Sequence, residues 1–362
     1  MIADRIRQAR LAAGLTLVEL GKQVGVSHTA IQKFEKGFLT PSSTQLLKLA
    51  RACGIRTEYF FRTHNVTLLN PEFRKHATFG KTAQEALKIK VIEMVEKRME
   101  LLSAFPQWPL PAFASPQTLT GLPKRVKALS EVDGFAEKMR EIWQLGMNPI
   151  GDLTDTLEGL GLLVIVVDDD HPGFSGLTAV AQTQNGNHYP IVATSKRWPG
   201  DRQRFMLAHE VAHILLNGRL AANIDEEKAC DRFAGSFLAP CAAVRHLLGN
   251  KRHALEWQEL YALKHEFGLS MAGWLTRAKQ CGVIADSTYL STIKRFSAKG
   301  WRKLEPGNPL PKEEPRLFQQ LVYRALAEQY ISEAKAAELL GIPLMRFHKQ
   351  RQLESVTAAI NQ

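Results

Sequence analysis

The apolar run at residues 205–216 has the periodicity of a helix, and it contains the sequence His209-Glu210-Val211-Ala212-His213. On a helix the first and fifth residues of this group lie on one face, so both imidazoles can reach the same metal ion. Glu210, the residue directly after His209, then lies beside the water that the metal binds. The pattern therefore restricts this segment to a helix and predicts that the two histidines are metal ligands.

Two histidines are not enough for a catalytic zinc site, which takes three protein ligands and leaves one position for water. Residues 225–234 begin a second amphipathic helix, on which Glu227 is the best candidate for the third ligand. Asp231, four residues later on the same face, is expected to accept the outer ring proton of a ligating histidine. Glu226 is the main rival as third ligand, although it points about 100° away around the helix.

The residues before the histidine-bearing helix predict a small sheet. Residues 162–167 form an apolar run typical of a strand, and residues 173–181 and 189–193 are two further candidate strands. A polar turn at residues 184–187 separates the last two. A small sheet followed by helices predicts an α+β organisation for the middle of the chain.

The amino-terminal residues 2–61 predict four or five short helices with capping residues at their starts and glycines at their ends. Residues 16–36 have the apolar spacing of a helix-turn-helix, with the turn at Gly25. The second helix of this motif presents polar side chains where they can reach base edges in the major groove. Gln32 can bond to an adenine edge, and Lys33 to guanine or phosphate. The residues expected to contact DNA are Ser27, His28, Thr29, Gln32, Lys33 and Lys36.

The charge of the chain favours a nucleic-acid partner for this segment. The formal net charge is +11 at pH 7, and residues 1–62 carry ten Lys or Arg against four Asp or Glu. Such a local excess is where a polyanion would bind. The alternative is a helical bundle that serves only for dimerisation or docking, because one fold can host several roles.

The sequence of residues 27–37, Ser-His-Thr-Ala-Ile-Gln-Lys-Phe-Glu-Lys-Gly, resembles the recognition helix of the Xre family, the lambda-repressor-like DNA-binding domains. The resemblance covers about the first 62 residues and implies double-stranded operator DNA as a partner. Such domains read two-fold sites as dimers, so the resemblance leaves open whether this chain forms a homodimer. An amphipathic helix expected at residues 82–102 either pairs with a second copy or packs on the next domain, and the pattern does not choose between these arrangements.

The metal-site region resembles the ImmA/IrrE family of zinc metallo-endopeptidases, whose members often carry an Xre-like domain in front. The resemblance spans roughly residues 134–240 and implies Zn²⁺ as cofactor, held by the metal ligands His209, His213 and Glu227, with Glu210 as general base. The chain departs from the family where Ala212 replaces the more usual Gly and Ala239 the more usual Met. The residues that carry the resemblance are Arg204, Phe205, Ala208, His209, Glu210, His213, Glu227, Asp231, Phe233, Ala234, Leu238, Ala239 and Pro240.

Two other interpretations of this region stay open. His209 and His213 could be core histidines of a buried helix, with Glu210 a solvated acid, although the fitting third ligand argues against this. Alternatively, the site binds zinc and serves as a sensor or scaffold without cleaving anything.

Cysteine usage and hydropathy limit the cellular compartments in which we expect this chain. The four cysteines are scattered without a Cys-x-x-Cys pair, so we expect reduced, mostly buried thiols rather than disulfides or a thiolate zinc cluster. No apolar stretch reaches the roughly 20 residues that cross a bilayer, and the amino terminus does not resemble a signal peptide. The expected location is the cytoplasm, with no membrane partner.

The expected fold class is mainly α and multidomain, with a small sheet in a central zincin-like domain. The expected function is a DNA-binding transcription regulator fused to an endopeptidase that cleaves a specific regulatory protein, a small repressor or antitoxin. A non-proteolytic zinc sensor and the toxin of a toxin-antitoxin pair are the alternatives. The expected domains are a helix-turn-helix bundle at residues 1–62, an amphipathic helix with a Pro-rich connector at 63–133, the metallopeptidase domain at 134–248 and a helical accessory domain at 249–362.

Overall fold

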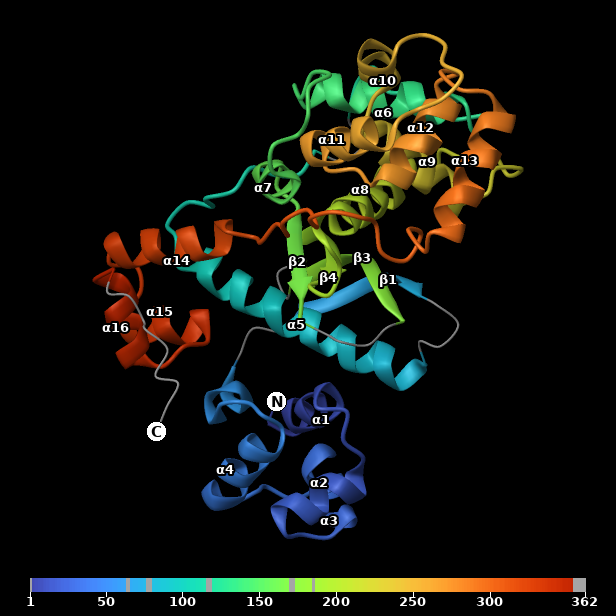
Figure 1. Ribbon diagram of the computed structural model, residues 1–362. Coiled ribbons are helices and arrows are strands. Elements are labelled where there is room, and N and C mark those ends of the chain that lie inside the picture. The colour runs from blue at the N-terminus through green and yellow to red at the C-terminus, as the bar shows by residue number, and fades with distance from the viewer. Residues whose placement is uncertain are drawn as a thin grey trace.

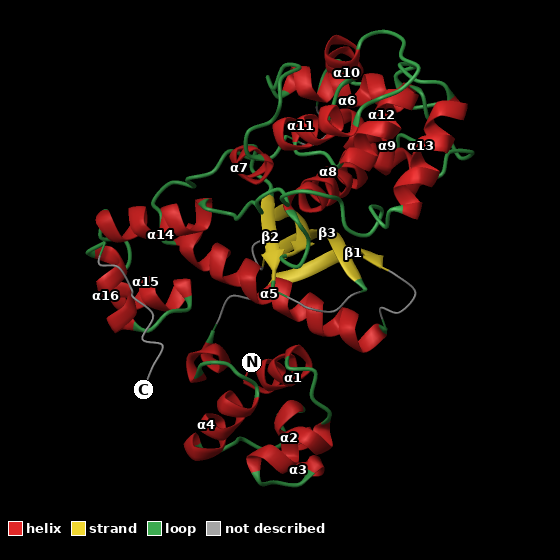
Figure 2. Ribbon diagram, in the orientation of Figure 1, coloured by secondary structure: helices red, strands yellow, loops and turns green. Residues whose placement is uncertain are grey.

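The computed structural model describes residues 2–62, 66–75, 80–114, 119–168, 173–183 and 186–353. It confirms a mainly helical, multidomain fold with a small four-stranded sheet. The amino-terminal helices lie at one end of the molecule, a lobe of helices lies at the other, and the sheet lies between them (Figure 1). Figure 2 shows that the strands are confined to this middle part.

The amino-terminal bundle has the predicted helices and caps. Thr16 and Ser27 accept hydrogen bonds from the backbone N–H groups of Glu19 and Ala30, and Gly25 ends the second helix with φ 81°. A side chain at Gly21 would place its Cβ 2.8 Å from the carbonyl oxygen of Val26, so only glycine allows the close packing at this turn. The elements are α1 (Ile2–Ala12), α2 (Leu17–Val24), α3 (His28–Glu35), α4 (Ser43–Ala52) and the 3-10 helix η1 (Thr57–Phe61).

The sheet has the strand order β1-β3-β4-β2, in which β3 pairs antiparallel with β1 and β4, and β2 pairs parallel with β4. The three strands expected from the sequence are present, and residues 184–185 of the expected turn lie outside the described residues. The strands are β1 (Val66–Lys75), β2 (Leu163–Val167), β3 (Phe174–Thr183) and β4 (His188–Ser195).

Strand β1 is not predicted by the sequence pattern, which reads as a polar stretch at this point. Val66 and Leu68 are buried, but a register shift between Leu69 and Glu72 interrupts the alternation. Asn70 at the shift has φ 46°. Because a bulge breaks the period of two on which strand prediction depends, the pattern gives no strand signal here.

The long helix α5 (Lys81–Ser103) was expected either to pair with a second copy or to pack on the next domain. It packs on the sheet, and most of its buried apolar residues share one core with all four strands. A buried ion pair joins it to the amino-terminal bundle, since Nη1 of Arg5 on α1 lies 2.6 Å from Oε2 of Glu96. Residues 115–118 of the Pro-rich connector that follows lie outside the described residues.

The remaining helices are divided between two hydrophobic cores. One core is shared by the helices of the upper lobe, and the other is shared by the sheet, α5 and the last three helices. The described residues 249–353 of the expected accessory domain therefore contribute to both cores. The lobe contains α6 (Glu131–Ile142), α7 (Leu153–Gly159), α8 (Gly200–Leu216), α9 (Glu226–Leu238), α10 (Cys241–Leu248), α11 (Trp257–Phe267), α12 (Met271–Gln280) and α13 (Asp286–Ala298). The last three helices are α14 (Leu317–Ala327), α15 (Glu333–Leu340) and α16 (Leu344–Arg351).

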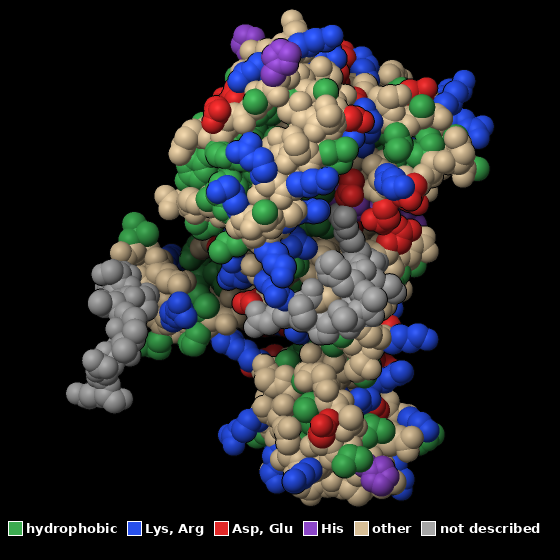
Figure 3. Space-filling model, turned by 45° about the vertical axis from the view of Figure 1, so that its right-hand side comes forward, with side chains coloured by type: hydrophobic (Ala, Val, Ile, Leu, Met, Phe, Trp, Pro, Cys, Tyr) green, Lys and Arg blue, Asp and Glu red, His purple; other side chains and the backbone are tan. Residues whose placement is uncertain are grey.

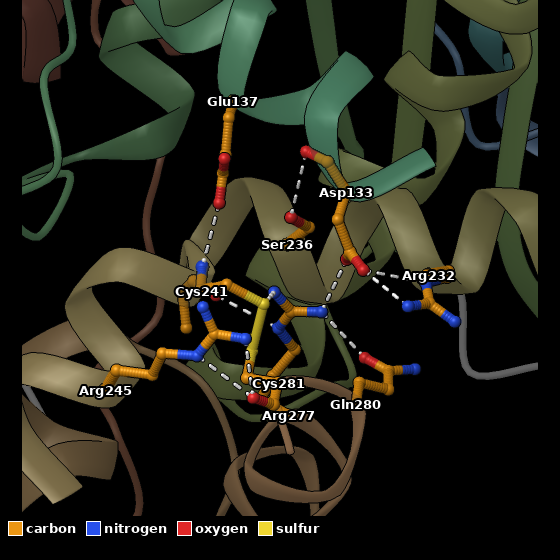
Figure 4. A network of polar contacts seen from close by, with 10 residues as sticks. Asp133, Glu137, Arg232, Ser236, Cys241, Arg245, Arg277, Gln280 and Cys281 are labelled. Atoms are coloured by element: carbon orange, nitrogen blue, oxygen red, sulfur yellow. Dashed lines mark hydrogen bonds and ion pairs between the residues drawn. A yellow bond between two sulfur atoms is a disulfide. The ribbon is translucent and has the colours of Figure 1, made fainter. Parts of the chain in front are cut away.

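The expectation that all four cysteines are reduced is wrong for one pair. Cys241 and Cys281 form a disulfide with a Cα–Cα distance of 5.4 Å, whereas Cys53 and Cys230 are free thiols. The two bonded cysteines are 40 residues apart and meet because α10 packs against α12. No local spacing could reveal this pairing, which is drawn in Figure 4. Among the described helices, none has the length and hydropathy that a bilayer span requires.

Candidate metal centre

Helices α8 and α9 bring the expected ligands together. α8 packs between the sheet and α9, so His209 and Glu210 are buried and His213 is half-buried. α9 starts at the capping residue Asp225, which accepts a hydrogen bond from the backbone N–H of Lys228. Its first turn carries Glu226 and Glu227, whose carboxylates lie 3.1 to 3.6 Å from ring nitrogens of the two histidines.

Three side chains bring donor atoms together at the separations that a zinc ion requires. Nε2 of His209 lies 3.1 Å from Nε2 of His213, and the Glu227 carboxylate oxygens lie 3.5 and 3.6 Å from these two nitrogens. A tetrahedral zinc ion with ligands at about 2.0–2.1 Å separates its donor atoms by about 3.3 Å. The residues present therefore fit this ion. The Glu227 side chain is 58% exposed, so the centre is open on that side.

Carboxylates hold the outer nitrogens of both imidazoles. Oδ1 of Asp231 lies 2.9 Å from Nδ1 of His209, in the position expected from the sequence. Glu226, the rival third ligand, instead places Oε1 3.1 Å from Nδ1 of His213. Such contacts fix the tautomer and orientation of a ligating histidine. Figure 3 shows acidic side chains gathered on the right of the molecule, below the lobe of helices.

Strand β1 adds one carboxylate that sequence reasoning did not find. Oε2 of Glu72 lies 3.9 Å from Nδ1 of His213. The pairing of β1 with β3 sets this position, since Glu72 is opposite Thr178. Because the strand itself gave no signal in the sequence, neither did Glu72.

Strand β3 positions the Glu210 carboxylate. The hydroxyl of Thr178 donates a 2.6 Å hydrogen bond to Oε2 of Glu210, and both side chains are buried. Gly176 on the same strand lies against this carboxylate, and a Cβ there would approach its Cδ to 2.7 Å. A glycine inside a strand often marks such a close approach, so Gly176 was the one signal in the sequence that could have pointed to this contact.

Cys230 is a further donor near the histidines. Its Sγ and donor atoms of His209 and His213 all lie within 4.8 Å of one another. Burial and then the neighbouring carboxylates raise the pKa of the Cys230 thiol well above its ordinary value. Cys230 and Glu227 both lie within reach of the two histidines.

The expected DNA contacts lie on a different part of the molecule. All six residues are exposed at the start or along the outer face of α3, at the opposite end from the lobe of helices (Figure 1). Ile31 and Phe34 on the inner face of α3 are buried in the bundle core. The hydroxyl of Ser27 also lies 2.8 Å from that of Thr29, so both side chains are involved in forming the helix start.

Comparison with known proteins identifies two domain families. Residues 6–60 match a helix-turn-helix family, and residues 161–278 match a peptidase family described as an IrrE N-terminal-like domain. An uncharacterized transcriptional regulator in the ATPase CF(0) region of Rhodospirillum rubrum is 37% identical over 60 residues, which are 17% of this chain and 56% of that protein. The match thus spans little more than half of that relative. No solved structure matches the chain. The chain carries an Xre-like helix-turn-helix domain followed by an ImmA/IrrE-like domain of the metallopeptidase type.

Proposed function

We propose that this chain is a DNA-binding regulator whose ImmA/IrrE-like domain is an active zinc endopeptidase. The substrate we propose is a specific regulatory protein, a small repressor or antitoxin. The observation that carries the proposal is the convergence of His209, His213 and Glu227 at separations of 3.1 to 3.6 Å. The buried carboxylate of Glu210 follows directly after the first of these ligands on α8.

The residues of the centre have distinct roles in this reaction. The two imidazoles and Glu227 would hold a zinc ion, which would serve as the Lewis acid that makes water nucleophilic near neutral pH. Glu210 accepts the proton of the attacking water and delivers it to the nitrogen of the leaving amine. Thr178 holds the Glu210 carboxylate in place through its 2.6 Å hydrogen bond. Asp231 and Glu226 hold the rings of His209 and His213 at their outer nitrogens.

Helix α3 supplies the DNA contacts in this proposal. Lys33 is exposed on its outer face, where it can pair with guanine or with a phosphate. A phosphate contact releases condensed counterions, so Lys33→Glu is expected to weaken binding and to flatten its salt dependence. A gel-shift series at several salt concentrations measures both effects. Equal affinity and equal slope for the variant would count against α3 as the recognition helix.

Cleavage is tested with the purified full chain and, as first substrate, any small repressor-like protein that an adjacent reading frame encodes. The wild type with one zinc per chain is expected to produce discrete fragments in mass analysis. Glu210→Gln is expected to retain the zinc and lose cleavage, because the amide cannot accept the water proton. Glu266→Gln, an exposed position on α11, is the matched control and should cleave normally.

The outcomes separate the alternative functions. Cleavage by Glu210→Gln at the wild-type rate would refute the assigned role of Glu210. A chain that binds operator and zinc but releases no fragments from its partner would be a sensor rather than a peptidase. If expression of the wild type arrests growth and expression of Glu210→Gln does not, the chain would be an enzymatic toxin. If both arrest growth, the toxin would be non-catalytic.

A further inference from the structure

A cavity of about 720 Å³ lies in the lobe of helices, beside the metal centre. It is lined by residues of α8, α9, α12 and α13 and by the chain from Trp301 to Pro309. This volume lies within the range of about 300–1,000 Å³ that is typical of small-molecule sites. Asp231, which contacts the outer nitrogen of His209, forms part of its wall. The proposed peptidase reaction uses no other residue of this cavity.

The segment that closes one side of the cavity is fixed in place. The Glu305 carboxylate accepts hydrogen bonds from the backbone N–H groups of Met271 and Ala272, at 3.1 and 3.0 Å, and thereby caps α12. It also accepts a 2.9 Å hydrogen bond from Nζ of Lys264. The wall segment that contains Trp301 and Leu304 is therefore anchored at Glu305, the residue directly after Leu304. The cavity is a built feature of the lobe rather than a gap between loosely joined segments.

The buried cations of the cavity wall are already neutralised. Lys264 lies within 3.1 Å of Asp201 as well as contacting Glu305. Burial lowers its pKa, but these two carboxylates more than offset that effect, so the pKa of Lys264 lies above its ordinary value. Arg277 and Arg232 both bind the Asp133 carboxylate, as Figure 4 shows. These cations need no ligand to balance their charge.

Two of the four exposed cations of the cavity are different, whereas Lys228 lies 3.8 Å from Asp225 and Arg202 lies over the Trp198 ring. In total, seven Lys or Arg and three Asp or Glu line it. Arg302 and Lys303 are exposed at its edge, and neither has an ion-pair partner within the described ranges of the chain. Apolar and aromatic side chains line the same cavity, among them Phe205, Trp301 and Leu269. A site of this kind attracts a negative group at its edge and buries an apolar group behind it.

We propose that this cavity binds a small organic anion with an apolar body. The negative group lies at Arg302 and Lys303, and the apolar body lies against Phe205, Trp301 and Leu269. An occupant of this size also reaches Asp231, the carboxylate that orients His209. The site is therefore distinct from the metal ligands but adjoins the residue that holds one of them.

The proposal is tested by fluorescence titration of the full chain with anilinonaphthalene sulfonate, an aromatic anion. Phenylnaphthylamine, which has the same rings without the sulfonate, is the neutral probe. We expect the sulfonate to bind one site, and Arg302→Glu with Lys303→Glu to weaken it at least about tenfold through charge repulsion. The neutral probe should bind more weakly and be unaffected by the same change.

Matched variants make the result specific to the cavity. Lys251→Glu with Lys294→Glu introduces the same charge at two exposed positions that do not line the cavity, and binding of the sulfonate should be unchanged. Thr276→Trp fills the cavity from α12 and should abolish binding of both probes. If thermal unfolding shows that this variant does not fold, the charge variants still decide.

Three results would overturn the proposal. The first is no saturable binding of the sulfonate to the wild type. The second is equal affinity of the sulfonate for the wild type and for the Arg302→Glu, Lys303→Glu variant, which would place the probe elsewhere. The third is binding of the neutral probe as tight as that of the sulfonate, which would show that the site does not select a negative group.

Discussion

Replacement of Thr178 by Val removes the hydroxyl that donates to Oε2 of Glu210 over 2.6 Å. Thr178 is 9% exposed and Glu210 only 1%, so solvent cannot readily replace the lost donor. A hydrogen bond to a charged group contributes about 1.5–3 kcal/mol, and a buried group that loses its partner bears the full cost. We therefore expect Thr178→Val to destabilise the packing of β3 on α8 by about 2 kcal/mol.

A second background isolates the interaction. In Glu210→Leu the carboxylate is absent, but the Thr178 hydroxyl still lies 3.1 Å from the backbone oxygen of residue 210. Thr178→Val should therefore still cost about 1 kcal/mol there, which leaves a coupling energy of about 1 kcal/mol between the two side chains. Thr154→Val is the control, since Thr154 is fully buried and its hydroxyl has no hydrogen-bond partner in the described part of the chain.

Hydrogen-exchange mass spectrometry on peptides from β3 and α8 measures these effects locally. A loss of 2 kcal/mol corresponds to about 30-fold faster exchange of the protected amides. The control Thr154→Val should leave these two peptides unchanged. The reasoning is refuted if Thr178→Val exchanges like the wild type, or if it has the same effect with and without Glu210→Leu.

Removal of the disulfide by Cys241→Ala with Cys281→Ala should lower the free energy of unfolding by up to about 4 kcal/mol, because the bonded residues are 40 residues apart in the sequence. A thiol titration of the unreduced, denatured chain that finds all 4 cysteines free would contradict the pairing. Glu96→Gln leaves Arg5 charged in a buried site and should cost about 3–5 kcal/mol in chemical unfolding, whereas Arg5→Met with Glu96→Leu should cost far less. Burial raises the pKa of the Cys53 thiol from 9.0 to about 11, so the unfolded chain ionises first. Stability should therefore fall as the pH rises from 9 through 11, and Cys53→Ala should reduce that fall.

Local sequence was sufficient to predict a helix wherever apolar residues repeat with the helical period and capping residues mark its ends. Thr16, Ser27 and Gly25 mark the ends of α2 and α3 through contacts within a few residues. The spacing of His209 and His213 places both on one face of α8 for the same reason. These elements need only hydrogen bonds between near neighbours, so their positions could be read before any tertiary contact was known.

The surroundings of the candidate site depend on contacts between distant residues. The alternation in β1 is interrupted by a bulge, so neither the strand nor Glu72 could be predicted. Thr178 reaches Glu210 only because β3 packs on α8, and Glu226 lies 3.1 Å from Nδ1 of His213 only because α9 packs on α8.

The sequence by itself determined the helix-turn-helix and the helix that carries His209 and His213, because each follows from short-range periodicity. Only the tertiary structure decided the Cys241–Cys281 disulfide, the division of the last helices between two cores and the cavity beside Asp231. Each of these arises where segments far apart in the chain pack together, and the pattern within one segment does not specify which other segment it will contact.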